Sequence, residues 1–320
     1  MSETITAGLA RALLPARPAD AHKYTFGRAL VVAGSLHYPG AASLATAAAA
    51  RTGAGLVTLA TGRSALGGPG RIPEVTLLPL PEAEPGALAE AAADDLRKEL
   101  PKTQALLVGP GIGRAEPTKL FLAALLGIDA PNHRPGIGFR HALTADSAAH
   151  AERAALPPMV LDADGLTLLA ELASAAAGVW ERLTPARCVL TPHAGEMARL
   201  LGVETLEGDR VELAREAAAR WGQIVLLKGP QTVIAAPDGR VRLHDGANPA
   251  LATAGTGDVL AGAIVGLLAQ GVDPFDAAAL GCYLHGAAGR MVADELGDMG
   301  ALASDLLPRL PLAARALRRG

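Results

Sequence analysis

The stretch FGRALVVAGSLHYPGAASLATAAAARTGAGLVTLAT, residues 26–61, decides the fold class. It contains an apolar run, ALVV at 29–32, an alanine-rich segment at 40–51, and a second apolar run, LVTLA at 56–60. Short runs that are almost entirely apolar are typical of strands buried on both faces, and an intervening helix allows two such strands to run parallel. The stretch therefore predicts a β-α-β unit.

The same alternation continues along the chain. Further apolar runs, each next to a helical pattern, occur in QALLVGPG (104–111), PMVLDADG (158–165), RCVLTPH (187–193) and QIVLLKG (223–229). The segment TVIAAPDGRVRLHDG (232–246) predicts two strands joined at Asp238-Gly239, and a long helical region follows from about Thr256. We therefore expect an α/β fold, a three-layer αβα sandwich with a mostly parallel central sheet.

The length of 320 residues and the apolar fraction of 50% are typical of one large globular domain. We assign residues 1–22 to an N-terminal extension and residues 23–320 to a single domain. Within that domain, residues 127–158 break the alternation with prolines and scattered charges, which predicts an inserted loop.

Composition excludes several classes of protein. The chain carries 29 basic and 32 acidic residues, for a formal net charge of −3, and only 3% of its residues are aromatic. Since it has neither a basic field nor many stacking side chains, we expect no nucleic-acid partner and no membrane attraction. Cys188 and Cys282 lack the spacing of a disulfide framework or a zinc site. No signal peptide or membrane span is evident, so the expected location is the cytoplasm.

The strongest functional motif is ATAGTGDVLAG, residues 252–262. Gly255 and Gly257 would let backbone N–H groups at a helix start approach an anion, and Thr256 adds a hydroxyl. Asp258, in the first turn, would lie next to a bound phosphate and could take a proton from an attacking hydroxyl. The alternative is that Asp258 only favours the helix dipole and the glycines only form a turn.

Other candidates follow apolar runs. GPGIGR at 109–114 puts Gly111 directly after a strand, and LTPHAGEMARLLG puts His193 and Glu196 three residues apart at a helix start. His193 could contact a substrate and Glu196 a metal-bound water, or the two could simply cap the helix. LLKGPQT places Lys228 at a strand end, where an ammonium could meet a polyphosphate or remain solvated.

Small and acidic residues complete the set. Asp162 and Asp164 alternate in LDADG, where they could order water or magnesium or cap the helix near Leu166. The small residues at 40–42 would admit a planar ligand or serve helix packing. All these motifs lie at the carboxyl ends of strands or at helix starts, which is the edge where open α/β sheets bind ligands.

Together these segments resemble the ADP/ATP-dependent NAD(P)H-hydrate dehydratase family, repair enzymes of the ribokinase-like superfamily. The likeness runs from about Tyr24 to Leu310, and TPHxGE, KGxxT and GTGDVLxG in this order make it specific. It implies a ribokinase-like fold and the dehydration of hydrated NADH or NADPH at the expense of ADP or ATP. A phosphoryl group would pass to the C6 hydroxyl of the (6S)-hydrate, and phosphate would then be eliminated.

The resemblance also implies residue roles. Asp258 would be the catalytic base, with Gly255, Thr256 and Gly257 as the anion hole. The residues implied to contact the hydrated dinucleotide are Ala41, Gly111, His193 and Asp258. Those implied to contact the adenine nucleotide are Lys228, Gly229, Pro230, Gln231, Thr232 and Gly257. Glu196 would hold Mg²⁺ through water.

Some features depart from the family pattern or leave alternatives open. The 127–158 stretch is longer than usual, Ala254 stands where many relatives have glycine, and no epimerase domain is seen, so we expect a separate NAD(P)H-hydrate epimerase as functional partner. A homo-oligomer is also implied. A vitamin-precursor or sugar kinase of the same superfamily would use the same Asp258, although Ala252 and Thr253 stand where a sugar kinase carries an acidic residue. A non-catalytic nucleotide-binding regulator is the third alternative.

Overall fold

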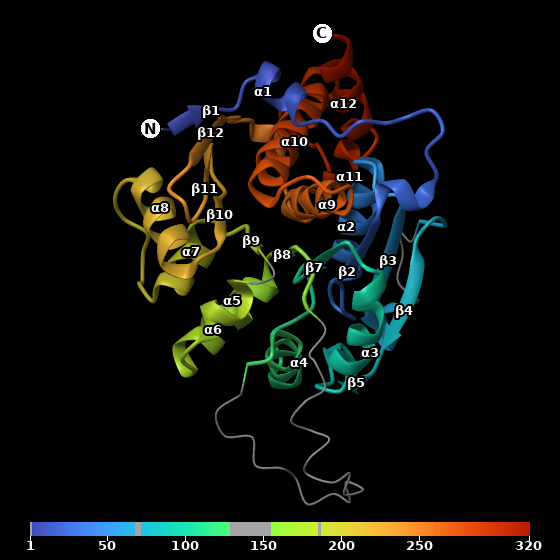
Figure 1. The fold of residues 1–320 in the computed structure, drawn as a ribbon, viewed down its shortest axis with the longest axis vertical. Coiled ribbons are helices and arrows are strands. Elements are labelled where there is room, and N and C mark those ends of the chain that lie inside the picture. The colour runs from blue at the N-terminus through green and yellow to red at the C-terminus, as the bar shows by residue number, and fades with distance from the viewer. Residues whose placement is uncertain (1, 68–71, 129–154, 185–186) are drawn as a thin grey trace, which may run out of the picture.

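The computed structural model describes residues 2–67, 72–128, 155–184 and 187–320. In these ranges a ten-stranded sheet lies between two layers of helices (Figure 1). Its strands, in spatial order, are β1 (Ser2–Thr4), β12 (Val241–Asp245), β11 (Gln231–Ala235), β10 (Ile224–Leu227), β9 (Val189–Leu190), β8 (Met159–Leu161), β7 (Ala105–Val108), β2 (Arg28–Val32), β3 (Leu56–Gly62) and β4 (Thr76–Leu80). A small separate hairpin is formed by β5 (Glu82–Glu84) and β6 (Ala87–Leu88).

The helices confirm the predicted alternation. They are α1 (Ala7–Ala12), α2 (Pro39–Arg51), α3 (Ala92–Glu99), α4 (Glu116–Leu126), α5 (Asp164–Ala175), α6 (Val179–Leu183), α7 (Ala194–Leu201), α8 (Arg210–Trp221), α9 (Thr256–Ala269), α10 (Pro274–Leu296), α11 (Ala303–Leu306) and α12 (Leu310–Arg319). No helix within the described ranges is long and apolar enough to cross a membrane.

The sheet is mostly parallel, as expected. From β4 through β3, β2, β7, β8 and β9 to β10 all neighbours run parallel. The antiparallel part includes the predicted hairpin of β11 and β12, and β11 also pairs antiparallel with β10, which the sequence did not predict. Strand β1 pairs with β12, so part of the 1–22 segment joins the edge of the main sheet. Of the predicted 127–158 loop, residues 129–154 lie outside the described residues.

Both faces of the sheet are buried, which explains the continuously apolar strands. Along β2, Ala29 and Val31 point into one apolar core, while Leu30 and Val32 point into the other. The first core lies under α2, α9 and α10, and the second under α3, α4, α5, α7 and α8. This two-sided burial is the physical basis of the three-layer sandwich.

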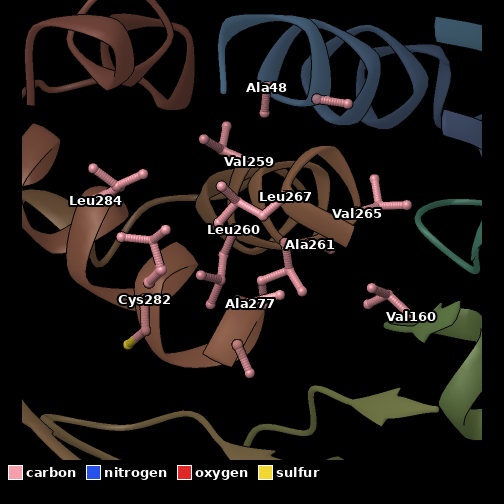
Figure 2. Close-up of a cluster of buried hydrophobic side chains, with 14 of the residues drawn as sticks. Ala48, Val160, Val259, Leu260, Ala261, Val265, Leu267, Ala277, Cys282 and Leu284 are labelled. Carbon is pink, nitrogen blue, oxygen red and sulfur yellow. The ribbon is translucent and has the colours of Figure 1, made fainter. Parts of the chain in front are cut away.

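Helix α9 packs unusually close to α2, and this contact positions the start of α9 (Figure 2). A β-carbon at Gly262 would lie 2.2 Å from the carbonyl oxygen of Ala45, and one at Gly266 would lie 2.6 Å from that of Ala49. Glycine at both positions therefore permits the approach. Around them α9 is buried almost throughout, so its N-terminus is held rigidly beside the sheet.

Candidate active site

The start of α9 has unpaired backbone N–H groups. Gly255 is the N-cap residue, with φ of +91°, a conformation that favours glycine, and no side chain caps the helix. Helices α2, α4 and α5 also begin without a side-chain cap, whereas α7, α8 and α10 begin with caps from His193, Asp209 and Asp273. Since the first N–H groups of a helix lack partners within it, the start of α9 offers free donors to an anion.

Thr256 lies in this turn, but its hydroxyl is already engaged. Its Oγ1 donates to the backbone, with Leu251 O at 2.9 Å and Thr253 O at 3.0 Å as acceptors. Its contribution to an anion hole would therefore come from its backbone N–H. The carbonyl of Thr256 accepts a hydrogen bond from His285 Nε2 at 3.0 Å, which further holds the turn.

Asp258 lies in the first turn of α9 and is partly buried. Burial, reinforced by the negative charges of Asp162 and Asp164 and opposed by Lys228, raises its pKa to about 7. Among the described residues no hydrogen bond or ion pair engages its carboxylate. An unengaged carboxylate with this pKa is suited to accept a proton near neutral pH.

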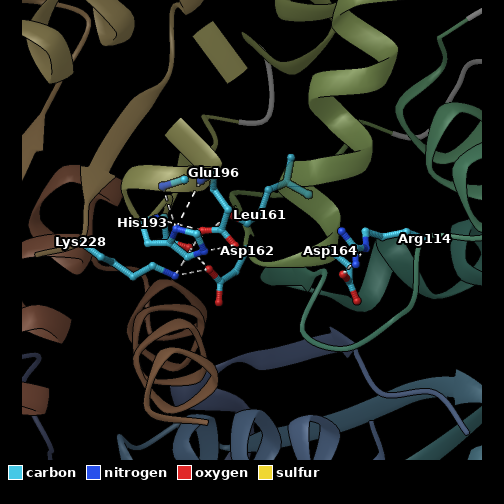
Figure 3. A network of polar contacts seen from close by, with 9 residues as sticks. Arg114, Leu161, Asp162, Asp164, His193, Glu196 and Lys228 are labelled. Carbon is cyan, nitrogen blue, oxygen red and sulfur yellow. Dashed lines mark hydrogen bonds and ion pairs between the residues drawn. The ribbon is translucent and has the colours of Figure 1, made fainter. Parts of the chain in front are cut away.

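A buried charge network lies beside this helix start (Figure 3). Asp162, at the end of β8 and 1% exposed, accepts hydrogen bonds from Thr191 Oγ1 at 2.7 Å and from Lys228 Nζ at 2.8 Å. Burial alone would lower the pKa of Lys228, but Asp162, Glu196 and Asp258 outweigh it and raise that pKa. A β-carbon at Gly257 would lie 3.6 Å from Nζ, so the ammonium faces the start of α9.

His193 and Glu196 form the capping box that the sequence left as an alternative to ligand contact. His193 Nδ1 accepts from the N–H groups of Gly195 and Glu196, at 3.0 and 3.3 Å, and Glu196 Oε2 accepts from the N–H of His193 at 2.9 Å. Burial raises the pKa of Glu196 and lowers that of His193. His193 remains exposed at this edge, so the cap leaves its ring available to a ligand.

Gly111 and Ala41 come together from separate segments. A β-carbon at Gly111 would lie 2.9 Å from the Ala41 side chain and 2.7 Å from that of Tyr38, so the turn after β7 packs against the start of α2. In the same turn, the N–H of Gly113 donates to Asp164 at 3.0 Å. Asp164 thus binds the Gly-rich turn while Asp162 binds Lys228, so the two aspartates serve different partners (Figure 3).

The segment 228–232 borders a cavity of about 510 Å³ that reaches the start of α9. Lys228, Gly229, Pro230 and Thr232 line this cavity together with Gly257. Gln231 is exposed and bonds Asp245 at 2.6 Å instead. Three polar residues of the cavity wall, His244, Asn248 and His285, were not predicted as site residues. Asn248 lies within the NPALATAGTGD motif, whereas nothing in the sequence singles out the two histidines.

A family model described as NAD(P)H-hydrate dehydratase matches residues 29–312. The chain belongs to the NAD(P)H-hydrate dehydratase family. The family resemblance found in the sequence is thereby confirmed.

Relatives of the NAD(P)H-hydrate dehydratase family match nearly the whole chain. It is 36% identical over 308 residues to the ADP-dependent (S)-NAD(P)H-hydrate dehydratase of Bacillus subtilis, covering 94% of each chain. It is 41% identical over 316 residues to a bifunctional NAD(P)H-hydrate repair enzyme of Moorella thermoacetica, covering 98% of this chain and 54% of the other. The chain thus spans about half the length of such bifunctional relatives.

A solved structure of this family has the same architecture. The crystal structure of the ADP/ATP-dependent NAD(P)H-hydrate dehydratase from Bacillus subtilis, co-crystallized with ATP/Mg²⁺, matches with a TM-score of 0.73. The two sequences are 31% identical, and the match covers 99% of each chain. The expected ribokinase-like fold is therefore confirmed.

Proposed function

We propose that this protein dehydrates (6S)-NAD(P)H hydrate to NAD(P)H and consumes ADP or ATP in doing so. The observation that carries the proposal is the uncapped start of α9, which combines free N–H donors with the unengaged Asp258 carboxylate beside Lys228. Membership of the NAD(P)H-hydrate dehydratase family supports it.

The phosphoryl group would bind where positive charge is concentrated. The N–H groups at Gly255, Thr256 and Gly257 carry the positive end of the α9 dipole, and the Lys228 ammonium faces the same turn. These donors are fixed before the reaction, by the α2 contact for the helix and by Asp162 for the lysine. Preorganised donors stabilise charge that develops during phosphoryl transfer.

Asp258 would act as the general base. It would accept the proton of the C6 hydroxyl while that oxygen forms a bond to the terminal phosphorus of the nucleotide, and the bond between that phosphorus and the leaving nucleotide oxygen breaks. With ADP the leaving product is AMP. The lone pair of the ring nitrogen then expels the phosphate from C6 and forms an iminium ion, and loss of a proton from C5 restores the 5,6 double bond of the dihydronicotinamide. A pKa of about 7 leaves Asp258 substantially ionised at neutral pH.

Two sides of the turn would hold the two substrates. We assign the hydrated dinucleotide to the side formed by Ala41, Gly111 and His193, all at the start of a helix or the end of a strand. The nucleotide would lie on the side formed by residues 228–232 and Gly257. Within that segment Gln231 faces away from the cavity, so we expect it to contribute through its backbone only.

Magnesium fits this site only as an ion shared with the nucleotide. Among the described residues no group of three or more His, Cys, Asp or Glu side chains is arranged to hold a metal. Glu196 already accepts a hydrogen bond from the His193 backbone, so it would reach Mg²⁺ through water, and phosphate oxygens would supply direct ligands. The ion would neutralise phosphate charge.

Three broader features are part of the proposal. Large apolar side chains exposed at the end of α10 and in the segment that joins it to α11, among them Leu296, Met299 and Leu302, support a homo-oligomer. The cytoplasm is where NAD(P)H and adenine nucleotides are abundant, and we place the protein there. The bifunctional relatives, about twice as long as their matching segment, support a functional link with a second activity, which we propose is an NAD(P)H-hydrate epimerase.

The decisive assay mixes purified protein with chemically hydrated NADPH, magnesium, and ADP, ATP or no nucleotide. Recovery of the near-ultraviolet absorbance of NADPH should require nucleotide and should fall at least a hundredfold in Asp258→Asn. No recovery, but nucleotide consumption when vitamin precursors or sugars are added, would assign a kinase. Nucleotide binding without any turnover would assign a regulator.

A further inference from the structure

We propose that a second cavity, at the opposite end of α9 from the proposed active site, binds a diphosphate group through arginine side chains. This arginine cavity has a volume of about 240 Å³ and lies where the segment after α1 meets the ends of α2 and α9 and one side of α12. Helix α9 has 14 residues, so at about 1.5 Å per residue its two ends lie about 20 Å apart. The site is therefore separate from the start of α9, and the inference does not rest on the proposed function.

Four arginines line this cavity, and none of the other described residues in its wall is acidic. They are Arg17, Arg51, Arg315 and Arg318, and all four are exposed, so their guanidinium groups can reach a ligand. The hydrogen bonds that Arg17 and Arg318 make go to neutral oxygens. Within the described ranges none of the four arginines pairs with a carboxylate. Four positive charges thus share one small space without a negative charge from the protein.

Arg17 is held in place at the cavity wall. Its Nη1 donates to the carbonyl oxygen of Gly53 at 2.8 Å and to Oε1 of Gln270 at 2.9 Å. Its guanidinium carbon lies 3.6 Å from the centre of the Phe26 ring. Because one nitrogen makes both hydrogen bonds, the N–H groups on Nε and Nη2 stay available to a ligand.

The other arginines add charge that the fold itself does not use. Arg318 donates to the carbonyl of Pro15 at 2.7 Å. No hydrogen bond or ion pair in the described part of the chain engages the guanidinium of Arg51 or Arg315. Partial burial lowers the pKa of Arg17, and the charge of Arg318 lowers it further. Repulsion between these cations costs free energy, and a bound anion would relieve it.

Helix dipoles explain only part of this cluster. Arg51 and Arg318 lie in the last turns of α2 and α12, where a cation offsets the partial negative charge of the carbonyl end. Arg315 lies before the last turn of α12, and Arg17 belongs to no helix. A helix end carries only about half an elementary charge, so these helix ends do not balance four guanidinium groups.

A diphosphate group matches this cavity in charge, hydrogen bonding and size. A guanidinium group binds phosphate oxygens through two parallel N–H groups, and a diphosphate offers oxygens to several arginines at once. The volume of about 240 Å³ lies below the roughly 300–1,000 Å³ typical of sites that enclose a whole drug-sized ligand. The cavity would therefore enclose the diphosphate of free pyrophosphate, or that of a nucleotide whose nucleoside remains outside.

The test removes the two arginines whose guanidinium groups make no bonds within the described chain, so that the fold is least disturbed. Arg51→Gln, Arg315→Gln and the double variant are compared with the parent. Arg220→Gln is the matched control, because Arg220 is also exposed in the last turn of a helix, α8, but lies outside the cavity. Thermal melting verifies that each variant is folded.

Binding of pyrophosphate is measured by titration calorimetry at low ionic strength, because salt screens exposed charges. We expect the parent to bind pyrophosphate, each single variant to bind it about tenfold more weakly, and the double variant about a hundredfold more weakly. The control should bind it as the parent does. The kcat and the KM for ADP should be the same in the double variant as in the parent, because the start of α9 is distant.

Titration with ADP distinguishes the two sources of the diphosphate. One more ADP site in the parent than in the double variant would assign the cavity to a nucleotide, and equal numbers of ADP sites would assign it to free pyrophosphate. A parent that binds no pyrophosphate, a double variant that binds it as the parent does, or an equal loss in the control would overturn the inference. If Arg51→Gln and Arg220→Gln lower the melting temperature equally and pyrophosphate binding is unchanged, the arginines only offset helix dipoles, which would also overturn it.

Discussion

Asp258 should destabilise the fold at neutral pH, because its raised pKa makes ionisation more costly in the folded protein. Burial and neighbouring aspartates raise that pKa from the ordinary 3.8 to about 7. The folded state therefore retains a proton that the unfolded chain releases as pH rises above 3.8. The free energy of unfolding therefore falls as pH rises from 3.8 to about 7. Above that range the ionised Asp258 lowers the free energy of unfolding by its full amount, at most about 4 kcal/mol.

Asp258→Asn removes this cost with little change in volume. The substitution should stabilise the protein at pH 8, and the gain should be larger than at pH 5 by up to about 3 kcal/mol. Urea unfolding followed by circular dichroism at the two pH values measures the difference. The same variant should have lost its dehydratase activity, so stability and turnover change in opposite directions.

A matched aspartate provides the control. Asp238 is exposed in the β11–β12 turn. Burial raises the pKa of its carboxyl, but hydrogen bonds from the backbone and side chain of Arg240, with the charge of Arg240, together outweigh burial and lower that pKa. Asp238→Asn should therefore not stabilise the protein at either pH. The reasoning is refuted if Asp258→Asn is no more stable than the parent at pH 8, or if its gain does not depend on pH.

Three further predictions concern the residues around Asp258. Lys228→Met leaves buried Asp162 without its cation and should lower the free energy of unfolding, measured in urea, by about 3 kcal/mol. Adding Asp162→Asn to the same chain should restore most of that loss. A single Lys228→Met variant as stable as the parent would contradict this. His193→Ala should cost about 1 kcal/mol of stability by removing the α7 cap, whereas His193→Asn, which can still cap, should cost little; equal losses would argue against the cap. Chelating magnesium should stop nucleotide-dependent turnover. It should leave the melting temperature of the nucleotide-free protein unchanged, because Glu196 already accepts a hydrogen bond from the His193 backbone and needs no metal to hold it. A lower melting temperature after chelation would indicate a metal bound in the absence of nucleotide.

Much of the fold could be predicted because the strands are buried on both faces. Runs such as ALVV at 29–32 are apolar throughout, and each lies next to a helical pattern, so the order of elements follows from the chain. The sequence did not reveal that Ser2–Thr4 pairs with β12. A three-residue edge strand with every residue exposed carries no apolar pattern, and only the distant partner defines it.

The candidate site was predictable where one short motif carries both the backbone geometry and the chemistry. The segment 252–262 is such a case, since the left-handed Gly255 and the first-turn Asp258 lie three residues apart. Roles that depend on distant partners were not predictable. Whether Asp162 meets magnesium or Lys228, and whether the Thr256 hydroxyl is free, depend on contacts that only the folded chain defines.

The residues of the cavity wall also could not be predicted from the sequence. His244 and His285 are far apart in the chain and come from a strand and a helix, so no spacing in the sequence joins them. Their burial reflects the packing of α10 against the hairpin. The family assignment could be made from motifs, whereas the meeting of His244 and His285 in one cavity wall required the structure.

The stoichiometry of the reaction with ADP tests the central claim most directly. NADPH is followed by its absorbance, and AMP, inorganic phosphate and any phosphorylated organic product are followed by phosphorus NMR in the same sample. The account predicts one AMP and one phosphate for each NADPH recovered, with recovery at least a hundredfold slower in Asp258→Asn. A stable phosphorylated product without recovery of NADPH would contradict it.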